Sequence, residues 1–292
     1  MRASVDVAAA LKPVFACFSF GLGACIASFL NVVIWRVPRG ESIVSPPSHC
    51  PKCGAPIRWW QNIPILSWLA LGGKCANCRA AISPRYILIE LLGGVLFLAT
   101  FLRYNPVDPF FGSPMAALLL VLWIWIALMI VGSFIDFDHQ LLPDFVTVGG
   151  MILGLVWAVA KAVWILLAFG RVGAALRPFV FSLAGLALGF GLLWLIRFLG
   201  TKAFKREAMG MGDVFLMGAV GALFGPVAVL FTLMTSAVAG SIVGIGMILL
   251  SKAKLGKFVA IPFGPYICLG CLAWMFCGPE AVAWYLKLLG VN

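Results

Sequence analysis

Long apolar runs dominate this sequence and constrain what it can fold into. About eight stretches are each long enough for a helix of about 20 residues, which crosses the roughly 30 Å of bilayer hydrocarbon. They lie at residues 14–35, 86–102, 115–135, 145–169, 179–199, 214–233, 234–250 and 259–277. Apolar residues make up 63% of the chain and charged residues 11%, too little polar surface for a soluble fold. We therefore predict an all-α polytopic membrane protein with about eight transmembrane helices, and we place one turn at Thr235 and Ser236 within 214–250.

Lysine and arginine residues crowd alternate loops, which predicts an orientation. The formal net charge is +11. The basic residues of the predicted first, fifth and seventh loops are Arg36, Arg39, Lys52, Arg58, Lys74, Arg79, Arg85, Lys202, Lys205, Arg206, Lys252, Lys254 and Lys257. The positive-inside rule then places the odd-numbered loops in the cytoplasm and the amino terminus outside. Nucleic-acid binding is not favoured, because no run away from the predicted helix ends combines dense basic residues with stacking aromatics.

The polar stretch at residues 36–85 is predicted to be a small cytoplasmic insert that binds zinc. It contains two CxxC pairs, Cys50 with Cys53 and Cys75 with Cys78, a pattern that directs four thiolates at one tetrahedral ion. Four cysteine ligands leave no position for water, so a structural ion is expected, and the alternative is four unliganded thiols. The remaining cysteines, which we interpret as small hydrophobic residues of the helices, are Cys17, Cys25, Cys268, Cys271 and Cys277.

Four of the ten acidic residues, Asp136, Asp138, Asp144 and Asp213, lie at predicted cytoplasmic helix ends. A carboxylate at membrane depth is costly, so each is a candidate functional group. We interpret Asp138 as a solvated loop residue and Asp144 as a helix cap behind a proline. Asp213 instead follows Gly210 and Gly212, glycines that permit close backbone approach and unusual dihedral angles beside an extended substrate.

Asp136 and Asp213 are therefore predicted to form a catalytic pair. Two nearby carboxyls share a proton, so the charged member can activate water while the protonated member donates a hydrogen bond to the developing oxyanion. The two histidines, His49 and His139, have no context that indicates a serine nucleophile. A transporter that uses the same carboxylates as a proton relay is the alternative. A zinc-binding module anchored by helices would leave both aspartates unexplained.

Five motifs follow one another along the chain. They are Ala27-Ser28-Phe29-Leu30-Asn31-Val32 with Arg36, the paired CxxC insert, Asp136-Phe-Asp-His-Gln-Leu-Leu-Pro-Asp144, Gly210-Met-Gly-Asp213 and Ile261-Pro262-Phe263-Gly264-Pro265. In this order they resemble the motifs of the type IV prepilin peptidases, and the resemblance covers nearly the whole chain. At Phe215 many relatives carry a lysine, so a charge partner for Asp213 is not expected there.

The resemblance implies a bifunctional enzyme of the bacterial inner membrane. The expected substrates are prepilins and pseudopilins, cut after glycine at the cytoplasmic face by Asp136 and Asp213. The new amino terminus would then be methylated from S-adenosylmethionine near the insert, where Glu41 and Glu90 are candidate residues with ordinary structural roles equally open. The expected parts are a first helix (1–35), the zinc insert (36–85) and a helical protease domain (86–292), with lipid and substrate as partners.

Overall fold

The computed structural model describes residues 2–104, 114–207, 209–250 and 262–290. The chain divides into two compact units, Met1–Val131 and Gly132–Asn292, and each is considered by itself. In the described residues the regular elements are helices, together with two isolated β-bridges, His49 with Pro56 and Lys74 with Ala81. The prediction of an all-α protein is therefore confirmed.

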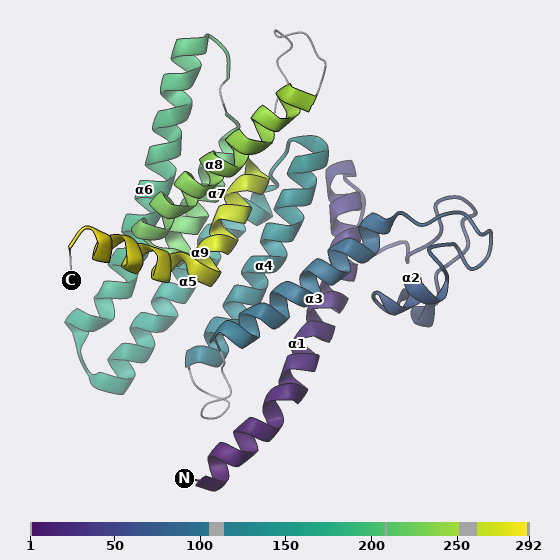
Figure 1. Cartoon of the computed structure of the whole chain (residues 1–292), viewed down its shortest axis with the longest axis horizontal. Helices are drawn as coiled ribbons and strands as arrows, with labels where there is room; N and C mark the ends of the chain where they lie inside the picture. Colours follow the sequence, from purple (N-terminus) through teal and green to yellow (C-terminus); the bar gives the residue numbers. More distant parts are fainter. Residues whose placement is uncertain (1, 105–113, 208, 251–261, 291–292) are drawn as a thin grey trace. The chain divides into compact units, whose positions relative to one another are not determined.

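Seven of the described helices are long and apolar enough to cross a membrane. They are α1 (Arg2–Arg36), α3 (Pro84–Tyr104), α4 (Pro114–His139), α5 (Asp144–Phe169), α6 (Val172–Phe204), α8 (Pro226–Leu250) and α9 (Gly264–Leu288) (Figure 1). A shorter apolar helix, α7 (Met211–Phe224), has 14 residues. The chain is thus a multi-pass membrane protein, as predicted.

In the first unit, α1 packs against α3 along a seam of small residues. A Cβ on Gly23 would lie 2.5 Å from the Gly93 carbonyl oxygen, and a Cβ on Gly93 would lie 2.5 Å from the Ala27 side chain. Small residues one turn apart let two helix backbones approach closely, which is how apolar helices associate in a bilayer. The polar insert between them contains the short helices η1 (Val37–Arg39), η2 (Trp59–Asn62) and α2 (Leu66–Ala70).

The second unit is organised around α7. Most of its side chains are buried, Asp213 among them. A Cβ on Gly221 of α7 would overlap the Gly185 carbonyl of α6, so neither glycine could be larger without separating the helices. At a rise of 1.5 Å per residue, 14 residues extend about 21 Å, short of the roughly 30 Å hydrocarbon core. Because α7 is short and enclosed by its neighbours, it positions a carboxylate inside the bundle.

The turn predicted at Thr235 and Ser236 is wrong. The break lies at Gly225, whose φ is +84° and which separates α7 from Pro226, the first residue of α8. The Thr235 hydroxyl donates to the Phe231 carbonyl (2.8 Å) and the Ser236 hydroxyl to the Tyr266 carbonyl of α9 (2.9 Å). Hydroxyls satisfied in this way do not end a helix. The predicted seventh-loop lysines and Ile261 fall outside the described residues.

Candidate active site

Asp136 lies in the last turn of α4 and is buried, with 5% of its surface exposed. Its Oδ2 accepts a hydrogen bond from the Gly264 backbone amide at 3.0 Å. Gly264 is the first residue of α9, where backbone amides have no partner within the helix and the helix dipole favours negative charge. The end of α4 and the start of α9, far apart in sequence, are therefore joined by a buried charge-assisted contact.

Gly264 allows this contact because it has no side chain. A Cβ at this position would lie 2.6 Å from Asp136 Oδ2 and 3.2 Å from Leu142 Cδ1. A distance of 2.6 Å is shorter than carbon and oxygen can approach without a shift, so any other residue would displace the carboxylate or the helix start. Gly264 is part of the candidate site, although the sequence reasoning did not include it there. The late Ile261-Pro262-Phe263-Gly264-Pro265 motif was the signal that could have identified it.

Asp213 lies in the first turn of α7 and is 8% exposed. The Gly210 amide and the Asp136 carboxylate both interact with its carboxylate electrostatically. The two aspartates are thus brought together from different helices, each beside a helix amino terminus. Two buried carboxyls that interact electrostatically cannot both ionise easily, which favours a state in which one of them is protonated. This arrangement can supply a general base and a hydrogen-bond donor at one place.

The two glycines before Asp213 differ from the expectation of unusual dihedral angles. Gly210 has φ −66° and ψ +151°, which any residue can adopt, and Gly212 is helical without a positive φ. A Cβ on Gly212 would lie 2.8 Å from Leu142 Cβ, whereas the closest atom to a Cβ on Gly210 is Asp213 Oδ2 at 3.6 Å. Gly212 is needed for packing against the protein's own chain, and Gly210 faces open space beside the carboxylate. The prediction of unusual dihedrals is therefore wrong, and close approach of a substrate to these glycines stays a prediction.

The neighbouring acids are placed differently from the buried pair. Asp138 and Asp144 are both exposed, but Asp138 lies in the last turn of α4 and not in the loop that we predicted. Asp144 is the first residue of α5 and does not cap it, because the N-cap is Pro143 and no side chain bonds there. The prediction that Asp144 caps this helix is wrong in that detail, although a carboxylate in a first turn still favours the helix dipole.

Comparisons with known proteins agree with the ordered motifs. Residues 22–104 match the bacterial peptidase A24 N-terminal domain, and residues 123–245 match the type IV leader peptidase family. The chain belongs to the type IV leader peptidase family. The resemblance predicted from the motifs is therefore confirmed, and family membership favours a peptidase over a proton-coupled transporter.

Relatives in this family carry the name prepilin leader peptidase/N-methyltransferase. One from Stutzerimonas stutzeri is 34% identical over 91% of this chain and 92% of its own length. One from Pseudomonas aeruginosa is 35% identical over 92% of both chains. One from Myxococcus xanthus is 43% identical over 81% of this chain, and the match spans 64% of that protein. No solved structure matches the chain.

A second residue that the sequence reasoning missed holds the loop before Asp213 in place. The Arg197 side chain of α6 donates to the Met209 carbonyl (2.9 Å) and to the Glu207 carboxylate (3.3 Å). Met209 immediately precedes Gly210, so Arg197 ties α6 to the start of the aspartate motif. A basic residue within an apolar helix was the available signal, because such a residue needs a polar partner.

In the first unit, the four insert cysteines converge as predicted. Their sulfur atoms all lie within 4.8 Å of one another, and Cys50 Sγ lies 3.9 Å from Cys78 Sγ. Tetrahedral coordination with bonds of about 2.3 Å separates sulfurs by about 3.8 Å, so the cluster fits a metal ion. The two pairs share one turn geometry: the Cys50 amide bonds to the Ala55 carbonyl (2.9 Å) and the Cys75 amide to the Ala80 carbonyl (2.8 Å).

The surroundings of these thiols favour thiolate ligands. The backbone amides of Cys78 and Asn77 lower the pKa of Cys75 to about 6. The Ala55 amide and the Asn77 side chain also lower the pKa of Cys53. The pKa of Cys78 is raised to about 11, because desolvation and the neighbouring thiols outweigh the lowering by the Ala80 amide. A cation among the four sulfurs would relieve this repulsion between thiolates.

The two acidic residues suggested for methyl transfer lie in different settings. Glu41 is exposed in the insert, whereas Glu90 is buried on α3. The sequence predicts no charge partner for Asp213 at Phe215. In the structure, Phe215 packs against Phe190 of α6, with ring centroids 5.6 Å apart. Cys268 and Cys271 are buried in α9, in agreement with packing roles.

Proposed function

We propose that this chain removes the basic leader of prepilins and pseudopilins after glycine, with Asp136 and Asp213 as its catalytic pair, and then methylates the new amino terminus. The observation that carries the proposal is the pair of buried carboxylates held beside the starts of α7 and α9 in a member of the type IV leader peptidase family. The relatives' name supplies the two reactions.

The aspartate pair supports direct attack by water. The charged carboxylate takes a proton from water as the water oxygen attacks the carbonyl carbon of the scissile bond. The protonated carboxyl donates a hydrogen bond to the carbonyl oxygen, on which negative charge develops. When the C–N bond breaks, the leaving nitrogen receives a proton from the pair, and the pair returns to its shared-proton state. No covalent bond to the enzyme is formed.

The cysteine cluster is proposed to bind structural zinc. Its four thiol ligands and their spacing support a closed tetrahedral site, which leaves no ligand position for water and so has no direct part in either reaction. The ion would contribute folding free energy to an insert that has few regular elements. The residues that would hold it are Cys50, Cys53, Cys75 and Cys78.

We also propose that the chain lies in the bacterial inner membrane with the amino terminus in the periplasm and the aspartate pair facing the cytoplasm. The basic residues of the insert and of the α6–α7 connection support this orientation. It would present the pair to the side of the membrane where a basic leader peptide resides before export.

The experiment that tests the proposed function uses the purified chain in detergent, a prepilin and S-adenosylmethionine. Intact-mass analysis should show loss of the leader and addition of one methyl group to the mature protein. A chain that leaves the prepilin intact under conditions that support a relative would refute the peptidase assignment. Cleavage without methylation would refute only the second activity.

A further inference from the structure

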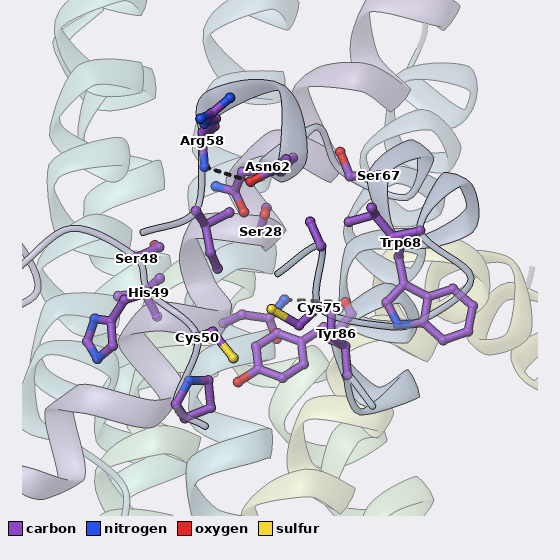
Figure 2. Close-up of a pocket in the computed structure, with 18 of the residues that line it drawn as sticks. Ser28, Ser48, His49, Cys50, Arg58, Asn62, Ser67, Trp68, Cys75 and Tyr86 are labelled. Carbon is purple, nitrogen blue, oxygen red and sulfur yellow. Dashed lines mark hydrogen bonds between the residues drawn. The ribbon is translucent and has the colours of Figure 1, made fainter. Parts of the chain in front are cut away.

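The first unit contains a cavity of about 970 Å³ between α1, the insert and α3. Figure 2 shows lining side chains from all three segments, including Ser28, Cys50, Trp68 and Tyr86. The volume lies near the upper end of the range of about 300–1,000 Å³ that is typical of small-molecule and cofactor sites. The mixture of aromatic rings with amide side chains such as Asn31 and Asn62 suits a ligand that combines a flat ring with polar groups.

Glu90 is the only acidic residue among those that line this cavity. It is 8% exposed, and among the described residues no cation forms an ion pair with it. Of the cationic residues in the lining, Arg36 uses its guanidinium on the Ser42 and Pro46 carbonyls at 2.8 and 2.7 Å. A carboxylate removed from water without a positive partner is costly, so the cavity offers a site for a cationic ligand.

The structure holds the Glu90 carboxylate in a defined orientation. Its Oε2 accepts a hydrogen bond from the Ile65 backbone amide at 2.7 Å. Ile65 has φ +64°, a conformation that a β-branched residue adopts only when its surroundings enforce it. The hydrogen bond therefore ties a strained insert loop to α3 and occupies one carboxylate oxygen, while the charge of the group is not neutralised by it.

Trp68 lines the same cavity and carries an enclosed hydrogen-bond donor. Its Nε1 is buried and lacks a hydrogen-bond partner within the described part of the chain. In Figure 2 the indole nitrogen lies on the side of the ring toward Cys75 and Tyr86. Buried indole donors usually have a partner, and because protein atoms enclose this nitrogen, a ligand acceptor would reach it only after those atoms shift.

We propose that this cavity binds S-adenosylmethionine, with the Glu90 carboxylate facing the sulfonium cation. The proposal rests on the methyltransferase activity proposed above and gives it a location. In the reaction, the lone pair of the neutral terminal amine attacks the methyl carbon, the carbon–sulfur bond breaks, and its electron pair stays on sulfur as S-adenosylhomocysteine. The methylated ammonium then releases a proton to solvent. Glu90 binds the donor through its positive charge and takes no part in bond making.

The role of Glu90 can be tested by binding alone, without measuring methyl transfer, by comparing the affinities of two nucleosides that differ in charge. S-Adenosylmethionine carries the sulfonium charge, and S-adenosylhomocysteine is the neutral thioether. By calorimetry on the purified full chain in detergent, the wild type should bind the sulfonium form about tenfold more tightly than the thioether, as expected for one charge-assisted contact. Glu90→Gln should reduce that preference to about twofold or less, because it removes the charge while its amide oxygen can still accept from Ile65.

Glu207→Gln is the matched control, because Glu207 is an exposed acid of the second unit, outside the cavity lining. This variant should keep the wild-type preference, and unchanged zinc content in both variants shows an intact insert. A wild-type preference in Glu90→Gln would overturn the assignment. If that preserved preference came with a higher KM for the prepilin amine, Glu90 would face the ammonium instead of the sulfonium. A chain that cleaves prepilin but binds neither nucleoside would refute the cavity, whereas a chain that fails to cleave would refute the proposed function instead.

Discussion

At the scale of single residues, the site depends on what Gly264 lacks. Its amide reaches Asp136 at 3.0 Å only because no Cβ stands between them. Gly264 is required because a side chain would meet the carboxylate, and not because the backbone there needs flexibility. Gly212 is likewise required by packing, in its case against Leu142. The residues around the two aspartates therefore constrain the geometry of the pair more than they contribute chemistry.

Replacing Gly264 by alanine should displace Asp136, since the new Cβ would lie 2.6 Å from Oδ2. We expect kcat/KM for leader cleavage to fall about tenfold to hundredfold, the usual effect of a misplaced catalytic group. The free energy of unfolding should fall by about 1–3 kcal/mol through overpacking. Gly191→Ala in α6, where nothing lies within 4 Å of the new atom, is the control. Equal cleavage rates in the two variants would contradict this role for Gly264.

At the scale of elements, the α6–α7 connection is held by Arg197. Arg197→Leu should free the Met209 carbonyl and loosen the start of the aspartate motif, lowering kcat/KM about tenfold or more. Glu207→Gln separates this effect from the ion pair. Because the Glu207 side chain is 79% exposed, its loss should change activity less than about twofold. If Glu207→Gln is as damaging as Arg197→Leu, the bond to the Met209 carbonyl is not what positions the loop.

The cysteine insert should lose its metal on acidification. The pKa of Cys75 is lowered from 9.0 to about 6, so its thiolate contribution is complete above about pH 9 and is lost as the pH falls through 6. Protons then compete with the metal for thiolates, and zinc affinity should fall at least about tenfold between pH 7 and pH 5. Competition with a coloured chelator measures this affinity, with Cys17→Ser as a control outside the cluster. If the purified chain contains no zinc, or if its zinc affinity does not change as the pH crosses 6, the cluster is not a thiolate site.

Removal of one ligand tests the structural role of the cluster. Cys50→Ser should release zinc and make the insert more sensitive to limited proteolysis, because three remaining ligands no longer close the coordination. Leader cleavage can survive this change, since the ion has no proposed part in the aspartate chemistry. Zinc content by atomic absorption and the proteolysis pattern check the prediction. A variant with wild-type zinc content and resistance would show that Cys50 is not a ligand.

At the scale of the whole molecule, sequence patterns were informative where one physical requirement dominates. Apolar length predicted the membrane helices, and paired CxxC spacing predicted the cysteine cluster. The break at Gly225 was missed because Thr235 and Ser236 look like a turn in sequence, yet their hydroxyls bond to carbonyls in the structure. The roles of Gly264 and Arg197 were missed because spacing in the sequence does not reveal their partners. Arg197 contacts Met209 across a loop, and Gly264 contacts Asp136 across most of the second unit.

The proposed orientation can be tested on the intact membrane. Arg171 and Lys205 are exposed residues at opposite ends of α6. In cells with a permeabilised outer membrane, a membrane-impermeant maleimide should label Arg171→Cys and should label Lys205→Cys only after the inner membrane is opened, with the native chain as background. The reverse pattern would place the aspartate motif in the periplasm and contradict the positive-inside assignment.

Leader cleavage by charge-neutral variants of the aspartate pair tests the central claim most directly. Asp136→Asn and Asp213→Asn, each purified in detergent and given a prepilin, should lose at least about a thousandfold in kcat/KM, because either change removes the shared-proton pair. The exposed neighbours provide matched controls, and Asp138→Asn and Asp144→Asn should stay within about threefold of wild type. Full cleavage by either Asp136→Asn or Asp213→Asn would contradict a catalytic pair at this site.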